Sequence, residues 1–238
     1  MYEWLFIIYG IFLLKENKIN IHANDERAFR NSCESGHIEI ARWLIQLGES
    51  EEYGKINIHT SDEWAFRNSC ENGHIEIARW LIKLGESGEY NRINIHTNNE
   101  WAFRSSCANG QIQLAHWLIQ LGESGEYGKI NIHTSNEWAF RWSCRNDRIN
   151  IDGGYAFGYS CRNGHIEIAR WLIQLGESGE YGKININADD EYAFIWSRNN
   201  GHIEIANWLI NLGESGEYGK ININANDEYA FKLTRNNG

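Results

Sequence analysis

Histidine and cysteine are the residues of this chain whose spacing could support chemistry, because both bind metal ions and both act in catalysis. Most of the nine histidines fall into two series. The first is His22, His59, His96 and His133, and the second is His37, His74, His165 and His202. Within each series, the histidines stand at the same position of different copies of a repeated sequence unit. Equivalent residues of stacked units lie about a helix diameter apart, whereas a zinc ion holds its ligands at about 2 Å. We therefore expect structural histidines that hydrogen-bond turn backbone, with no metal and no cofactor.

The cysteines also recur at one position, five residues after the alanine of a repeated Ala-Phe pair. They are Cys33, Cys70, Cys107, Cys144 and Cys161. Their odd number, and the absence of any Asn-x-Ser/Thr sequon, favour free thiols in a reducing compartment. We expect buried, small, apolar side chains rather than disulfides or metal ligands, and a cytoplasmic location.

A glycine-containing loop, 122–129, superficially matches a phosphate-binding loop. It has five residues between Gly122 and Gly128 instead of four, Ile130 stands where Ser or Thr is needed, and its glutamates would repel phosphate. The sequence contains no His-Glu-x-x-His, Gly-x-Ser-x-Gly or Cys-x-x-Cys motif. No nucleophile, base and orienting group can be assembled, so we expect no enzyme.

The element that must position these residues is an internal repeat. The Ala-Phe pair begins at Ala28, Ala65, Ala102, Ala139, Ala156, Ala193 and Ala230. Its steps are 37 residues, except for 17 between Ala139 and Ala156. A fixed period of this size indicates one supersecondary unit that is copied and stacked, with a core that forms between neighbours.

Each copy predicts a pair of helices. In the copy at 56–92, a first helix is expected from Asp62 to about Glu71, because Asp62 is an N-cap candidate and Asn72-Gly73 can end the helix. A second helix follows, with one apolar stripe, and ends at Gly85. A polar loop and a short extended piece, 93–96, lead into the next copy. The predicted fold is all-α, a solenoid of stacked helix-turn-helix pairs with short extended turns between repeats.

The residues of this copy resemble the ankyrin repeat. The resemblance is clearest at Gly73-His74-x-Glu76 and at Leu81-Ile82-Lys83-Leu84-Gly85, and Gly-His recurs at 36–37, 164–165 and 201–202. It covers about 19–238 and implies a surface for protein–protein interaction. The Ala-Phe opening and the Asn-Gly-His-Ile-Glu-Ile-Ala run are similar, more narrowly, to divergent ankyrin proteins of giant DNA viruses of amoebae. That similarity implies a viral protein that engages a host protein, with the host cytoplasm as its location.

The chain also departs from the ankyrin pattern. It contains no proline, and arginine replaces the histidine of Thr-Pro-Leu-His at Arg30, Arg67, Arg104 and Arg141. We expect helix entry to depend on acidic residues and caps instead. A tetratricopeptide array is a less favoured alternative, because Trp80, Leu84 and Tyr90 have the wrong spacing for that motif.

The array is expected to have irregular parts. Residues 1–18 form a half repeat, a second helix, since the apolar stretch at 1–14 lacks a basic start and is too short for a membrane span. The array occupies 19–238, with a truncated repeat at 130–148 and a terminal half repeat at 221–238. The truncation is either a binding notch or a recombination scar, and we favour the scar. Uncapped ends suggest self-association or a fragment of a longer protein.

Charge and composition limit the partners. The net charge of -10 argues against nucleic-acid binding, which needs clustered Lys and Arg. Many of the tryptophans and phenylalanines stand at repeat-locked positions, which favours core packing over a base-stacking groove. We expect neither nucleic acid nor membrane as a partner.

Differences between copies indicate where a protein partner would bind. After each cysteine the residue changes from acidic to basic, and two positions after the phenylalanine small polar residues give way to aromatic ones. The candidate partner-binding residues are Glu34, Glu71, Trp142, Arg145, Tyr159, Arg162 and Trp196. Aromatic residues and arginine are common interface anchors, although these rings could instead repack the contact between helices. The predicted function is a non-enzymatic scaffold for protein–protein interaction, with a self-associating structural component as the alternative.

Overall fold

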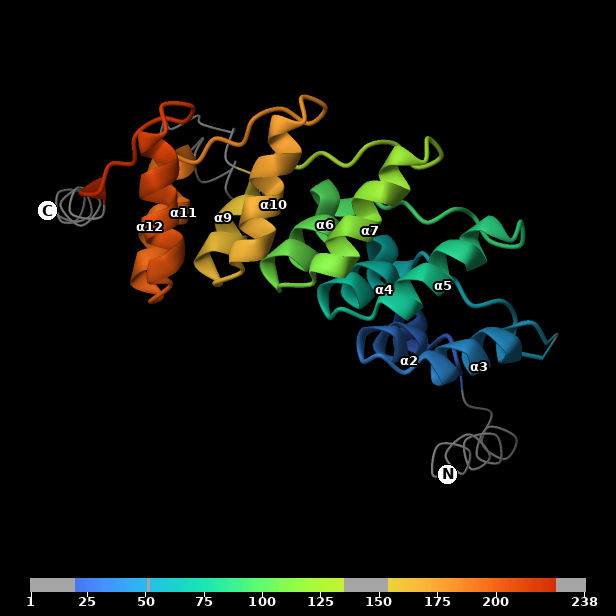
Figure 1. The fold of residues 1–238 in the computed structure, drawn as a ribbon. Coiled ribbons are helices and arrows are strands. Elements are labelled where there is room, and N and C mark those ends of the chain that lie inside the picture. Colours follow the sequence, from blue (N-terminus) through green and yellow to red (C-terminus); the bar gives the residue numbers. More distant parts are fainter. Residues whose placement is uncertain (1–19, 51, 135–153, 226–238) are drawn as a thin grey trace, which may run out of the picture. The chain divides into compact units, whose positions relative to one another are not determined.

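The computed structural model describes residues 20–50, 52–134 and 154–225, and in these ranges the regular elements are helices (Figure 1). The helices are α2 (Ala23–Glu34), α3 (Ile38–Gly48), α4 (Thr60–Glu71), α5 (Ile75–Glu86), α6 (Thr97–Ala108), α7 (Ile112–Glu123), α9 (Tyr155–Arg162), α10 (Ile166–Glu177), α11 (Ala188–Asn199) and α12 (Ile203–Glu214). They alternate as the expected first and second helices of successive copies. The all-α fold class is therefore confirmed.

The chain forms two compact units, Met1–Thr97 and Asn98–Gly238, and each is considered by itself. In the first unit, α2 packs against both α3 and α4, and α4 packs against α5. In the second unit, α9 packs against α10 and α11, and α11 packs against α12. In each unit, then, first helices lie against one another as well as against their own second helices.

The core of both units forms between successive copies, as the repeat predicts. Phe29 in α2 is fully buried and its ring centroid lies 6.3 Å from that of Trp80 in α5, the second helix of the next copy. In the second unit, Phe157 and Trp208 have the same relation, also at 6.3 Å. A fully buried phenylalanine contributes about 1.5–3 kcal/mol. Phe29 and Phe157 are core residues, and the half-buried Trp80 and Trp208 pack on them across the contact between copies, which confirms the expected packing role.

The cysteines described by the structure belong to the same core. Cys33, Cys70, Cys107 and Cys161 are free and buried. Burial raises the pKa of the Cys33 thiol to about 12. Thiols of this kind are unreactive, because the thiolate is the nucleophile and the metal ligand. Cys144 lies outside the described residues.

The entry to the first helices differs from the expected cap. Ser61, Asp62 and Glu63 have left-handed backbone, with φ values of 53°, 56° and 60°, and the side chain of the N-cap residue, His59, makes no cap bond. The same conformation occurs at Asn24-Asp25-Glu26, Asn98-Asn99-Glu100 and Asp189-Asp190-Glu191. Left-handed geometry costs L-residues about 1–2 kcal/mol each. The acidic residues therefore lie in a left-handed turn within the first residues of α4 and do not cap it, which corrects the prediction.

An arginine holds this left-handed turn. Arg67 Nε donates to the carbonyl of Asp62 at 2.6 Å, and its Nη2 donates to the carbonyl of Ser61 at 3.0 Å. Arg30 and Arg104 make the equivalent pairs of bonds. A planar guanidinium can satisfy two neighbouring acceptors at once, and a histidine ring cannot. This geometry explains why arginine replaces the histidine of the ankyrin pattern in these copies.

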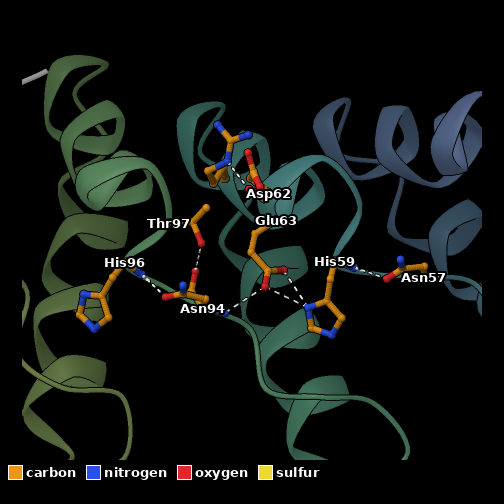
Figure 2. A network of polar contacts seen from close by, with 8 residues as sticks. Asn57, His59, Asp62, Glu63, Asn94, His96 and Thr97 are labelled. Carbon is orange, nitrogen blue, oxygen red and sulfur yellow. Dashed lines mark hydrogen bonds and ion pairs between the residues drawn. The ribbon is translucent and has the colours of Figure 1, made fainter. Parts of the chain in front are cut away.

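The glutamate that ends each left-handed turn joins its own copy to the next. Figure 2 shows Glu63 between His59 and Asn94, the latter in the following copy. Glu63 Oε1 lies 2.9 Å from His59 Nδ1 and accepts the backbone N–H of Asn94 at 3.1 Å. Glu26, Glu100 and Glu191 accept the equivalent N–H groups of Asn57, Asn131 and Asn222, each at 3.1 Å. In the copies that contain α2, α4, α6 and α11, one buried carboxylate thus fixes the extended piece of the neighbouring copy, whereas the copy that contains α9 has Gly154 at this position.

Histidines of the first series also bind turn backbone, as expected. The ring Nε2 of His22 lies 2.7 Å from the carbonyl oxygen of Tyr53, and that of His133 lies 2.7 Å from the carbonyl oxygen of Tyr181. Asn187 replaces histidine in a later copy and donates to the carbonyl of Lys220 at 2.9 Å. This confirms a structural role for His22 and His133, whereas the ring Nε2 of His59 is buried without a hydrogen-bond partner.

Histidines of the second series pack against a glycine of the preceding copy. A Cβ at Gly36 would lie 2.7 Å from His74 Cε1, and one at Gly164 would lie 2.7 Å from His202 Cε1. Both glycines also have positive φ, at 81° and 86°. Glycine is therefore favoured before this histidine for two reasons: the backbone has positive φ, and the histidine ring of the next copy leaves no room for a Cβ.

The region of the shortened step contains one regular junction. The N–H of Tyr155 donates to the carbonyl of Thr134 at 3.2 Å, so the extended piece that ends before residue 135 lies beside the start of α9. Ser160 in α9 donates to the carbonyl of Cys107 in α6 at 3.2 Å. The helix pair α9–α10 therefore follows α6–α7 as the next copy. Residues 135–148 lie outside the described ranges, so the truncated repeat at 130–148 stays a prediction, as do the half repeats at 1–18 and 221–238.

Candidate partner-binding surface

The first helices α9 and α11 carry a cluster of aromatic rings in the second unit. The rings of Tyr155 and Tyr159, one turn apart on α9, stack with centroids 3.9 Å apart and an interplanar angle of 15°. Tyr159 lies 5.6 Å from Tyr192 on α11, and Tyr192 lies 6.0 Å from Trp196. Because i and i+4 residues share one face of a helix, the two helices place these four rings in one continuous row.

Arg162 lies within this row. Its guanidinium carbon is 5.3 Å from the ring centroid of Tyr159 and 4.8 Å from that of Trp196. Its Nη1 donates to the Tyr192 hydroxyl at 2.9 Å, and this hydrogen bond raises the pKa of Arg162. A cation at these distances from ring faces is attracted by the ring quadrupoles, by about 0.5–1 kcal/mol at an exposed site. The name α9–α11 surface is used below for Tyr155, Tyr159, Arg162, Tyr192 and Trp196.

The α9–α11 surface is partly open to solvent. Trp196 is 36% exposed and is among the most exposed large apolar side chains of the described residues. Burial raises the pKa of the Tyr192 hydroxyl, which lies deeper, so it stays protonated at neutral pH. The rings are thus held in place by their neighbours, while Trp196 is exposed and Arg162, beside it, is half-buried.

Three of the residues predicted from sequence are brought together on this surface: Tyr159, Arg162 and Trp196. Glu34 and Glu71 lie in the first unit, on α2 and α4. There, the indole N–H of Trp64 donates to Glu34 Oε2 at 3.4 Å. Trp142 and Arg145 lie outside the described residues, and their proposed role is untested.

Sequence comparison between copies missed Tyr155 and Tyr192, which complete the row. Both stand immediately before an Ala-Phe pair, a position that holds Trp64 in α4 and Trp101 in α6. An aromatic residue in nearly every copy indicates scaffold packing, so the position did not stand out. The signal that could have found them is the additional aromatic residue one turn later. Tyr159 follows Tyr155 and Trp196 follows Tyr192 by four residues, so each pair shares one face of its helix.

Arg104 marks the edge of the surface on α6. Its guanidinium carbon lies 4.6 Å from the ring centroid of Tyr155, while its Nε and Nη2 bind the left-handed turn of its own copy. Only 3% of Arg104 is exposed, and burial lowers its pKa. Arg104 is therefore a structural support for Tyr155, and Arg162 is the arginine that a partner can reach.

The described part of the chain holds no group of three or more His, Cys, Asp or Glu side chains placed to bind a metal ion. Of the helices in the described ranges, none has the length and apolar character needed to cross a bilayer.

The α9–α11 surface offers stacking, cation–π contact and hydrogen-bond donation. These are interactions that hold a ligand.

Comparison with known families agrees with the geometry. The model of the family "Ankyrin repeats (3 copies)" matches residues 106–227, about half of the chain. The chain belongs to the ankyrin-repeat family. A search of curated proteins found no match. Ankyrin repeats generally mediate protein–protein interaction and are typically non-enzymatic.

Proposed function

We propose that this protein is a non-enzymatic ankyrin-repeat scaffold that binds another protein through the α9–α11 surface. The observation that carries the proposal is the exposed Trp196 beside Arg162, on a row of rings that is already ordered. Aromatic residues and arginine dominate interface hot spots, and pre-ordered side chains lose little entropy on binding. The first unit has Asn31 and Asn68 where the second has Tyr159 and Trp196, so it lacks this row.

The proposal extends to the kind of partner and its location. The similarity to ankyrin proteins of giant DNA viruses of amoebae supports a host protein as the partner. The buried free thiols support a reducing compartment, the cytoplasm of the cell in which the protein acts. The capture experiment below tests the host partner together with the surface.

The experiment is affinity capture from an amoeba lysate, quantified by mass spectrometry, with two baits. One bait is the wild-type protein, and the other is the α9–α11 variant, which carries Tyr159→Asn, Arg162→Glu and Trp196→Asn. These substitutions install the residues that α4 has at the same positions, Asn68 and Glu71, so the helix should tolerate them. We expect at least one protein that the wild type captures and the variant does not. If every captured protein is recovered equally by both baits, the proposed surface is wrong.

Self-association is a second candidate function. In the described part of the second unit, Ile203 and Ile223 are 55% and 54% exposed, more than any other large apolar side chain. Light scattering over a concentration series separates the two candidates. A scaffold stays monomeric without its partner, whereas an assembly component grows in mass as concentration rises.

A further inference from the structure

We propose that the α9–α11 surface takes an acidic segment of the partner in which a carboxylate side chain lies next to an aromatic one. The carboxylate would pair with Arg162, and the aromatic ring would pack on Trp196. This inference rests on the proposed function, because it names the chemistry of the partner at the same surface.

The position of Arg162 favours a carboxylate. The Tyr192 hydroxyl accepts one N–H of the guanidinium, and Tyr159 and Trp196 lie against its faces. A guanidinium has several N–H donors in one plane, so an edge remains for a second acceptor. Because the guanidinium is already held between the rings, it loses little conformational entropy when it binds. Its free edge can then pair with both oxygens of a carboxylate.

The local charge also favours an acidic ligand. In α9, and in α11 after Glu191, the sequence contains Arg162 and Arg198 but no Asp or Glu. The equivalent stretch of α4 carries one acid, Glu71, beside its arginine, Arg67. Arg162 is thus the one charged residue of the α9–α11 surface, on a chain whose net charge is -10, and the acids of α11, Asp189, Asp190 and Glu191, lie in its left-handed turn. At physiological salt the Debye length is about 8 Å, so a docked segment responds to this local charge more than to distant carboxylates.

Trp196 accounts for the aromatic half of the ligand. Its ring is 36% exposed, and the equivalent residues Asn68 and Ser105 show that the fold does not need an aromatic residue there. Its neighbour Tyr192 lies 6.0 Å away at an angle of 45°, which leaves a ring edge and face for another aromatic side chain. Aromatic pairs in such tilted arrangements gain stability beyond their buried area.

The test uses immobilised random copolymers as probes and the full chain as analyte, in biolayer interferometry. The probes are poly(Glu,Tyr), poly(Glu), poly(Lys,Tyr) and oligo(dT). The chain variants are Arg162→Glu and Trp196→Asn, each matching a residue that α4 carries at the same position. Lys83→Glu, on the exposed side of α5, is the control, because it changes the charge as much as Arg162→Glu does, far from the surface in sequence.

We expect wild-type protein to bind poly(Glu,Tyr) more tightly than poly(Glu) or poly(Lys,Tyr), and less tightly as salt rises. Arg162→Glu and Trp196→Asn should each weaken binding roughly tenfold or more, as loss of a hot spot does, while Lys83→Glu should leave it within about twofold. Unfolding curves of all variants check that each one is folded.

Three results would overturn the inference: no binding to poly(Glu,Tyr), equal binding to poly(Lys,Tyr), or stronger binding to oligo(dT). If one of these occurs while captured proteins still depend on the α9–α11 surface, the acidic-segment inference is wrong and the proposed function stands. If the wild type and the α9–α11 variant also capture every protein equally, the proposed function is wrong as well.

Discussion

Removal of the buried carboxylate of Glu63 is the sharpest test of how the copies are joined. Glu63 is 7% exposed, and its Oε1 serves both His59 Nδ1 and the backbone N–H of Asn94, 31 residues further on. A hydrogen bond to a charged acceptor contributes about 1.5–3 kcal/mol, and in this variant the part-buried N–H of Asn94 loses that acceptor. His59 is partly exposed and can bind water instead. We therefore expect Glu63→Ala to lower the free energy of unfolding by about 2–3 kcal/mol, chiefly through the lost Asn94 bond.

Glu63→Gln separates the two bonds. The amide oxygen of glutamine can still accept the Asn94 N–H, whereas the charge facing His59 is lost, so we expect a loss of about 1 kcal/mol. Glu76→Ala, an exposed position on α5, should change stability by less than about 0.5 kcal/mol.

The assay is urea unfolding followed by circular dichroism, with hydrogen exchange of the Asn94 amide as a local readout. Protection of that amide should fall strongly in Glu63→Ala and partly in Glu63→Gln. The account of the junction is refuted if Glu63→Ala is no less stable than Glu76→Ala, or if protection of the Asn94 amide is unchanged in both Glu63 variants.

Three further predictions follow from the packing. Gly164→Ala should destabilise the protein by about 1–3 kcal/mol more than Gly201→Ala, because both glycines have positive φ but a Cβ would meet a ring, that of His202, only at Gly164; equal losses in urea unfolding would contradict the ring contact. An NMR titration should place the pKa of His22 above 6.5, because Glu26 and the Tyr53 carbonyl favour its charged form, and that of His165 below 6.5, because burial disfavours charge. His22 then stabilises the fold below pH 6.5, and this contribution is lost as pH rises through its folded pKa. The contribution of His165 is present above pH 6.5 and is lost as pH falls below that value. A His165 pKa above that of His22 would contradict this prediction. An aromatic disulfide reagent should label at most one of the five thiols quickly in the native protein, because four of them are buried: Cys33, Cys70, Cys107 and Cys161. Fast labelling of two or more thiols would contradict that burial.

The helix pairs could be predicted because their signals are local. The Gly-His turn, the apolar stripe of the second helix and the repeated Ala-Phe pair all lie within a few residues of the structure they specify. The burial of the four described cysteines and of Phe29, and the packing of Trp80 on Phe29, followed from their fixed place in the repeat. A period that recurs through the chain makes each of these inferences stronger than a single copy would allow.

The left-handed turns could not be predicted because their causes are not local. Asp62 and Glu63 before an apolar helix read as a cap and a first-turn acid, which is the commonest role of such residues. In the structure, Glu63 instead serves a backbone group of the next copy, and Arg67 holds the strained turn from within the helix. Only the three-dimensional stacking of copies brings these groups together.

The candidate surface was predictable in part. Copy-to-copy differences pointed to Tyr159, Arg162 and Trp196, which lie together on α9 and α11. They also pointed to Glu34 and Glu71, whose helices belong to the other unit. Difference between copies marks a position as variable, but it does not say which variable positions share one face.

The dissociation constant of a captured partner measures directly what the α9–α11 surface contributes to binding. It is measured for the wild type, the α9–α11 variant and a first-unit variant with Glu34→Ala and Glu71→Ala, where alanine is the residue at the equivalent position of α6, Ala108. We predict at least tenfold weaker binding by the α9–α11 variant and a change within about twofold for the first-unit variant. Unchanged binding by the α9–α11 variant, or a larger loss in the first-unit variant, would contradict it.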